Sequence, residues 1–184
     1  MDKDSIWWTR KSWINAESRL LRYANWSNIS LFWYSLCGVF ASVLLLGEEQ
    51  PNVISKVFIC FSVFVFCASL FTSLGRYNER ARKFKSGYIA LQSLYLEVKE
   101  QTKLNNDDAA RYSKILESCE NCSWIDFLNA KVEAYNNAKD KSFLSIDVNN
   151  KDKVVFYLMK TLNIFTLASI LMAPAAIIFI SIYR

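Results

Sequence analysis

The sequence VISKVFICFSVFVFCASLFTSLG spans residues Val53 to Gly75 and carries one charged side chain, Lys56, near its beginning. At a rise of about 1.5 Å per residue, a helix of this length crosses the roughly 30 Å hydrocarbon core of a bilayer. A lysine near the end of such a helix can extend its ammonium group to the headgroups. The stretch therefore predicts a membrane-spanning helix.

Two further runs are equally apolar. ISLFWYSLCGVFASVLLLG covers Ile29 to Gly47, and TLNIFTLASILMAPAAIIFISIYR covers Thr161 to Arg184, with no charge before its last residue. The first run and Val53–Gly75 predict a transmembrane hairpin over residues 29–75. The third predicts a C-terminal membrane helix over 161–184, and the sequence leaves open whether it spans the bilayer or re-enters.

The charges beside these runs predict an orientation. The turn of the hairpin contains Glu48 and Glu49, whereas Lys and Arg gather before the first run and after the second. Because Lys and Arg accumulate on the cytoplasmic side, the N-terminus and residues 76–160 are expected in the cytoplasm. The acidic turn and the C-terminus are then expected outside.

A basic block follows the second run directly, in GRYNERARKFKSG (Gly75–Gly87). Its cations, which we call the collar, are Arg76, Arg80, Arg82, Lys83 and Lys85. Their first expected role is topology and anchoring at the lipid headgroups of the bilayer. Direct nucleic-acid binding is the weaker alternative, because residues 76–160 carry fifteen Lys/Arg against twelve Asp/Glu.

Apolar positions continue through the collar in alternating steps of four and three. This heptad seam comprises Leu70, Leu74, Tyr77, Ala81, Phe84, Tyr88, Leu91, Tyr95 and Val98. The spacing predicts one long helix, continuous from Val53 to Leu104, that packs against other helices. The partner helices can belong to the same chain or to other copies in a homo-oligomer, and the sequence does not choose between them.

A polar stripe runs beside the seam on the second membrane run, with seven-residue spacing: Ser55, Ser62, Ser69 and Arg76. Hydroxyl groups on one side of a membrane helix can line a water-filled path. They can equally bond to carbonyls of the preceding turn or pack against a neighbouring helix. Both interpretations stay open.

Four glycines and two prolines in 184 residues favour an all-α chain. Residues 1–28 predict an amphipathic helix whose Trp7, Trp8 and Trp13 lie at the membrane interface. Residues 76–140 predict a cytoplasmic helical domain, with helices starting at NNDD (Asn105–Asp108) and at the capping box SWID (Ser123–Asp126). Residues 141–160 are polar and predict a linker.

The residues point to no catalytic chemistry. The chain has no histidine, and its CENC motif (Cys119–Cys122) has neither a second cysteine pair nor a histidine to complete a zinc site. No Gly-rich phosphate loop or nucleophile motif occurs. We therefore expect no enzyme activity, cofactor or metal, and structural roles for the cysteines.

Three quoted stretches together resemble the SLATT family: WTRKSWINAESRLLRYANWSNISLFWYSL, RYNERARKFKSGYIALQSLY and YSKILESCENCSWIDF. The resemblance covers roughly residues 6–130. It implies a bacterial inner-membrane protein with two transmembrane helices that acts as a pore-forming or membrane-disrupting effector in anti-phage defence. One branch of the family is similar to this chain and tends to be encoded with a reverse transcriptase, so the resemblance implies that enzyme or its nucleic-acid product as a partner.

Two functions follow as expectations. The first is a membrane effector that forms a homo-oligomeric pore, or perturbs the bilayer, when a cytoplasmic signal moves its membrane helices. The second is an oligomeric membrane scaffold that anchors a nucleic-acid enzyme such as a reverse transcriptase. A transporter is disfavoured, because the membrane runs contain no acidic residue or histidine.

Overall fold

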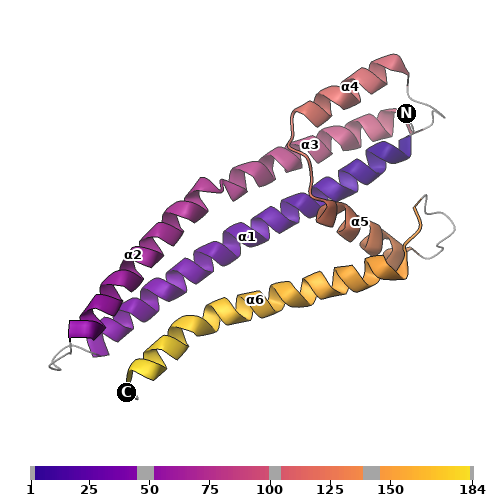
Figure 1. Cartoon of the computed structure of the whole chain (residues 1–184). Helices are drawn as coiled ribbons and strands as arrows, with labels where there is room; N and C mark the ends of the chain where they lie inside the picture. Colours follow the sequence, from indigo (N-terminus) through magenta and orange to yellow (C-terminus); the bar gives the residue numbers. More distant parts are fainter. Residues whose placement is uncertain (1–2, 45–51, 100–104, 139–145, 183–184) are drawn as a thin grey trace. The chain divides into compact units, whose positions relative to one another are not determined.

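The computed structural model describes residues 3–44, 52–99, 105–138 and 146–182 (Figure 1). These residues form helices and short connections without a strand, which confirms the all-α prediction for this part of the chain. The helices are α1 (Lys3–Leu44), α2 (Asn52–Leu74), α3 (Tyr77–Glu97), α4 (Asn106–Glu117), α5 (Trp124–Asn137) and α6 (Asn150–Ile182). The acidic turn of the hairpin and the predicted helix end at Leu104 lie outside the described residues.

The chain divides into two compact units. Unit 1 comprises residues 1–22 and 77–160, and unit 2 comprises residues 23–76 and 161–184. The chain passes between the units within α1, within α6, and at the connection between α2 and α3. The part of α6 in unit 1 begins at Asn150, inside the stretch that the sequence predicts to be a polar linker.

The core of unit 1 lies between the N-terminal half of α1 and α3, with α4 against them. Trp13 contributes the largest α1 side chain and packs edge-on against Phe84 of α3, with ring centroids 5.9 Å apart. The buried core residues are Ile6, Trp13, Ala16, Leu20, Ala81, Phe84, Leu91, Leu94, Val98 and Tyr112. On α1 they recur at the three- and four-residue spacing of one helix face, so packing against α3 follows directly from the pattern.

Trp8 and Trp13 correct the expectation that the tryptophans near the N-terminus lie at the membrane interface. Trp8 is 7% exposed and packs on Phe127 of α5, and Trp13 is 3% exposed in the core. Tryptophan next to Arg and Lys is equally suited to both settings, because its ring has a large apolar area and a single polar N–H group. Here helices of the same chain cover the rings.

Local capping signals correctly predict two helix starts. Asn105 is the N-cap of α4, and its side chain accepts a hydrogen bond from the backbone N–H of Asp108. Ser123 is the N-cap of α5 within a complete capping box, in which the Asp126 carboxylate accepts from the backbone N–H of Ser123. Each cap satisfies backbone N–H groups that have no partner inside the helix.

The predicted long continuous helix is wrong, because the helix is interrupted between Leu74 and Tyr77. Arg76 has φ 45°, in the left-handed region, and its N–H group donates to the carbonyl of Ser73 at 3.3 Å. A non-glycine residue with this φ cannot continue a right-handed helix. The seam is therefore divided between α2 and α3.

Unit 2 is the membrane unit by composition. Two stretches of the described helices are long and apolar enough to cross a membrane, Ile59–Glu97 and Asn150–Pro174, and none of the residues in the most apolar part of either is buried. The first stretch contains most of α2 and continues past its interruption. The run Ile29–Gly47 is not among them, and its last three residues lie outside the described part, so a third membrane helix stays a prediction.

The first testable consequence concerns Gly87, where α3 packs tightly on Trp13 of α1. A Cβ atom on Gly87 would lie 2.4 Å from Cζ3 of Trp13 and 2.7 Å from Sγ of Cys119. Because both neighbours belong to the packed core, Gly87→Ala should destabilise the fold by about 1–3 kcal/mol through overpacking. In thermal unfolding of the detergent-solubilised protein, Tm should fall by roughly 2–12 °C.

The control is Ser86→Ala, on the exposed side of the same helix turn. It should leave Tm nearly unchanged, because exposed substitutions of this kind change stability little. Equal Tm values for Gly87→Ala and Ser86→Ala would contradict the close packing of α1 on α3.

Candidate functional site

Asp126 of α5 is a buried carboxylate that accepts three hydrogen bonds. Its side chain is fully buried and accepts two hydrogen bonds from Arg19 of α1, from Nε to Oδ1 at 2.8 Å and from Nη2 to Oδ2 at 2.9 Å. Oδ2 also accepts from the backbone N–H of Ser123 at 3.0 Å. The carboxylate lies in the first turn of α5, where the helix dipole stabilises a negative charge. This bidentate pair between Arg19 and Asp126 fixes α5 against α1.

A second ion pair connects α5 to the start of α6. Lys131 Nζ lies 2.6 Å from Oδ2 of Asp152, and both side chains are mostly buried. The hydrogen bond from Lys131, together with the backbone N–H of Asn149, lowers the pKa of the Asp152 carboxyl below its ordinary value. Lys153 also lies over the ring of Tyr135, 4.2 Å from its centroid. An ion pair and a cation–π contact therefore connect the beginning of α6 to α5.

The collar residues differ in their surroundings. Arg80 pairs with Glu120 at 2.7 Å, whereas Arg82, Lys83 and Lys85 have exposed side chains on α3. Arg76 is exposed at the interruption between α2 and α3. Three exposed cations on one helix, close in sequence to an apolar segment, remain suited to anionic headgroups.

Most seam residues of α3 lie in the core of the chain itself. Ala81, Phe84, Leu91 and Val98 are buried, and Tyr77, Tyr88 and Tyr95 are partly buried against them. By contrast, Leu70 and Leu74 of α2 are 51% and 79% exposed. The structure therefore assigns the α3 part of the seam to contacts inside one chain and leaves the α2 part exposed.

The three serines of the polar stripe lie on α2. Ser62 and Ser69 are exposed, and the side chain of Ser55 lies outside the described residues. Because both described side chains are exposed in the single chain, a path enclosed by them would need several copies of the chain.

The two cysteines of the CENC motif are thiols within the packing of unit 1. Cys119 Sγ donates to the carbonyl of Lys83 at 3.2 Å, and burial raises the pKa of both the Cys119 and the Cys122 thiol. Raised pKa values keep thiols protonated and weakly nucleophilic. No cluster of His, Cys, Asp or Glu suited to a metal ion occurs among the described residues.

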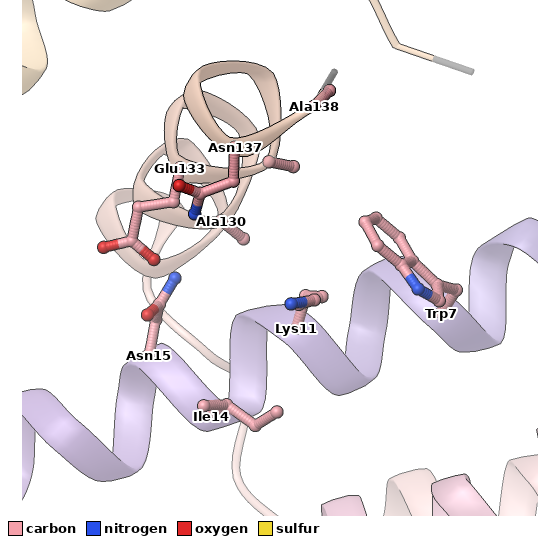
Figure 2. Close-up of a pocket in the computed structure, with 9 residues that line it drawn as sticks. Trp7, Lys11, Ile14, Asn15, Ala130, Glu133, Asn137 and Ala138 are labelled. Carbon is pink, nitrogen blue, oxygen red and sulfur yellow. The ribbon is translucent and has the colours of Figure 1, made fainter. Parts of the chain in front are cut away.

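A cavity of about 310 Å³ lies between α1 and α5 in unit 1 (Figure 2). Asn15 points across it, and its amide can accept from the backbone N–H of Ala130 and donate to Glu133. Lys11 lies 5.6 Å from the centre of the Trp7 ring. In this orientation the Asn15 amide bridges α1 and α5 across the cavity.

Unit 2 contains a pair of polar contacts that the sequence did not predict. The indole Nε1–H of Trp33 donates to the carbonyl of Leu171, and the hydroxyl of Tyr34 donates to the carbonyl of Ile170, both at 2.9 Å. The donors belong to α1 and the acceptors to α6. The available signal was Pro174, because a proline within an apolar helix leaves a carbonyl four residues earlier without its usual partner.

Comparison with known proteins gives one family. Residues 2–181, nearly the whole chain, match the family described as SMODS and SLOG-associating 2TM effector domain family 5. No curated protein and no solved structure matches the chain.

The buried ion pair generates the second prediction. Arg19→Met leaves the Asp126 carboxylate buried without its cation, and we expect a loss of about 3 kcal/mol, the low end for a broken buried pair because Arg19 is 20% exposed. Glu120→Gln, which breaks the exposed pair with Arg80, should cost about 0–1 kcal/mol. Thermal unfolding in detergent measures both.

A double variant isolates the charge. Adding Asp126→Asn to Arg19→Met should recover part of the lost Tm, because the neutral amide is less costly to bury. If Arg19→Met and Glu120→Gln lowered Tm equally, Asp126 would not be the central contact between α1 and α5.

Proposed function

The chain belongs to SMODS and SLOG-associating 2TM effector domain family 5, and from this premise we propose that it is the membrane effector of a bacterial anti-phage defence system. On a cytoplasmic signal it oligomerises and opens a pore or perturbs the inner membrane. It acts through its membrane helices and not through catalysis.

The observation that carries this proposal is the exposure of large apolar side chains along the helices of unit 2. Large side chains along α2 have more than half of their surface uncovered, and they include Ile59, Val63, Phe64, Phe66, Leu70, Phe71 and Leu74. In water, such a patch would far exceed what monomeric proteins expose. A lipid environment covers it without cost, which supports membrane insertion of α2 and α6.

A packed unit 1 supports a signal-receiving role. Its helices α1 and α6 each extend without interruption into unit 2. A helix transmits displacement along its axis, so a ligand or partner that changes unit 1 would act on the same helices that enter the membrane. A reverse transcriptase or its nucleic-acid product is the partner that we propose to test first.

The orientation that we propose places the N-terminus, the collar and residues 76–160 in the cytoplasm. Exposed Arg82, Lys83 and Lys85 on α3 fit the anionic cytoplasmic leaflet. Residues 48–49 and the C-terminus then lie outside.

The pore that we propose is homo-oligomeric and lined by α2. Because Leu70 and Leu74 are exposed in the single chain, they can contact α2 of another copy. Ser55, Ser62 and Ser69 would then form rings of hydroxyl groups, and Arg76 a ring of charge that disfavours cations.

Cysteine labelling in cells tests the orientation. In a variant whose five native cysteines are replaced, Glu48→Cys should react with a membrane-impermeant maleimide in intact cells. Ser113→Cys, on α4 of unit 1, should react only after the membrane is opened. Reaction of position 48 only after opening would reverse the orientation.

Ion flux through liposomes tests the pore. Ser62→Leu and Ser69→Leu should each lower flux at least several-fold, while Arg76→Glu should shift selectivity toward cations. The control is Cys67→Leu, which lies about 200° around the helix from Ser69 and adds similar bulk. Native mass spectrometry in detergent checks assembly of each variant.

Three results would contradict the proposal in different ways. Equal flux for the serine variants and the control removes the stripe from the lining. A wild-type monomer removes the oligomer. Benign overexpression without depolarisation, together with co-purification of a nucleic-acid enzyme, favours a membrane scaffold over an effector.

A further inference from the structure

Pro174 creates a specific problem for α6. It lies inside the helix, within the apolar run 161–184. Proline has no backbone N–H group, so the carbonyl of Ile170, four residues earlier, loses its usual donor, and the ring also pushes against that carbonyl. In the hydrocarbon core there is no water to replace the donor, and an unsatisfied carbonyl there is costly.

The structure supplies the missing donor from another helix. The hydroxyl group of Tyr34 on α1 donates to the Ile170 carbonyl at 2.9 Å, and the indole N–H of the adjacent Trp33 donates to the Leu171 carbonyl, also at 2.9 Å. Two consecutive side chains thus bond to two consecutive carbonyls, beginning with the one that the proline releases. Two adjacent donors on α1 bond to two adjacent acceptors on α6, and this match argues for a specific interaction.

The ring of Tyr34 is held in place by α2. It stacks on Phe61 with ring centroids 6.0 Å apart and an interplanar angle of 12°. Stacked aromatic pairs stabilise one another beyond the area that they bury, so the contact with Phe61 helps to hold the ring with its hydroxyl group at the Ile170 carbonyl. Tyr34 therefore links three helices of unit 2. It belongs to α1, its ring contacts α2, and its hydroxyl group bonds to α6.

The buried residues of unit 2 allow its helices to approach closely. Among the described residues of this unit, the buried side chains are Ala24, Cys37, Ala41 and Pro174, all of them small. Helices in lipid gain little from burying large apolar side chains and associate instead through small residues and hydrogen bonds. Cys37 and Ala41 follow Trp33 and Tyr34 on α1 at helical spacing.

We propose that Trp33 and Tyr34 are positioning residues that dock α6 onto α1 inside the membrane by bonding to the carbonyls beside Pro174. The docking joins the C-terminal apolar run to α1 within the membrane. This inference rests on the membrane location that we propose above, but it does not require that the protein conducts ions.

Photocrosslinking tests the docking directly. With p-benzoylphenylalanine in place of Tyr34, irradiation of the full-length protein in nanodiscs should form an intramolecular crosslink to α6, at or next to residues 170–174, identified by mass spectrometry. The control carries the same group in place of Phe40, a 59% exposed residue of α1, and should give at most one tenth of that crosslink. Equal yields at both positions would overturn the docking.

A double-mutant cycle tests the role of the carbonyl. Tyr34→Phe keeps the ring and removes only the hydroxyl group, and it should lower Tm by about 2–4 °C, the shift expected for a chain of this size that loses one hydrogen bond within the membrane. In the Pro174→Ala background the N–H group of residue 174 can bond to Ile170 itself. There the effect of Tyr34→Phe should fall below half of its wild-type value.

Trp33→Phe has a matched control in Trp26→Phe, the same change on an exposed residue of the same helix. Only the first should lower Tm by a comparable amount. An unchanged Tyr34→Phe effect in the Pro174→Ala background, or equal effects of the two tryptophan variants, would overturn the bonding role. None of these experiments measures ion flux. If α6 docks on α1 but the protein conducts no ions, the pore is refuted and the docking is not.

Discussion

The Asp126 carboxylate is the contact on which the arrangement of unit 1 depends. It is fully buried, it accepts both Arg19 donors, and it completes the N-terminal cap of α5. One side chain thus sets where α5 begins and how it lies against α1. From α5 the Lys131–Asp152 pair then holds the start of α6. Each step uses charge, which is effective here because partial burial shields these pairs from competing water and salt.

In unit 2 the helices are held together by different interactions. Lipid is as apolar as leucine, so helices there are not driven together by the hydrophobic effect. Small side chains on α1 permit close contact, and Trp33 and Tyr34 bond to carbonyls of α6. The helices α1 and α6 are consequently connected within each unit, through α5 and its ion pairs in unit 1 and through direct hydrogen bonds in unit 2.

The features that sequence alone predicted are the ones with local causes. Ser123 and Asp126 specify a helix start within four residues, and the apolar runs of α2 and α6 need only their own composition. Contacts between residues that are far apart in the sequence were not predicted. The tryptophans were placed at the membrane interface because their cover, Phe84 and Phe127, is not visible from the α1 sequence. Likewise, Pro174 shows that a carbonyl needs a donor, but the sequence does not identify Tyr34 as that donor.

The heptad seam shows how the interruption at Arg76 changes a functional argument. Read as one helix, the seam offered a single surface that could be shared between copies along its whole length. With α2 and α3 separated, the α3 residues Phe84 and Leu91 fill the core of their own chain and are no longer available to a second copy. The seam residues that the single chain leaves most exposed are therefore Leu70 and Leu74 of α2. That part lies on the same helix as Ser62 and Ser69, so in the oligomeric pore that we propose one helix would supply both the contact between copies and the lining.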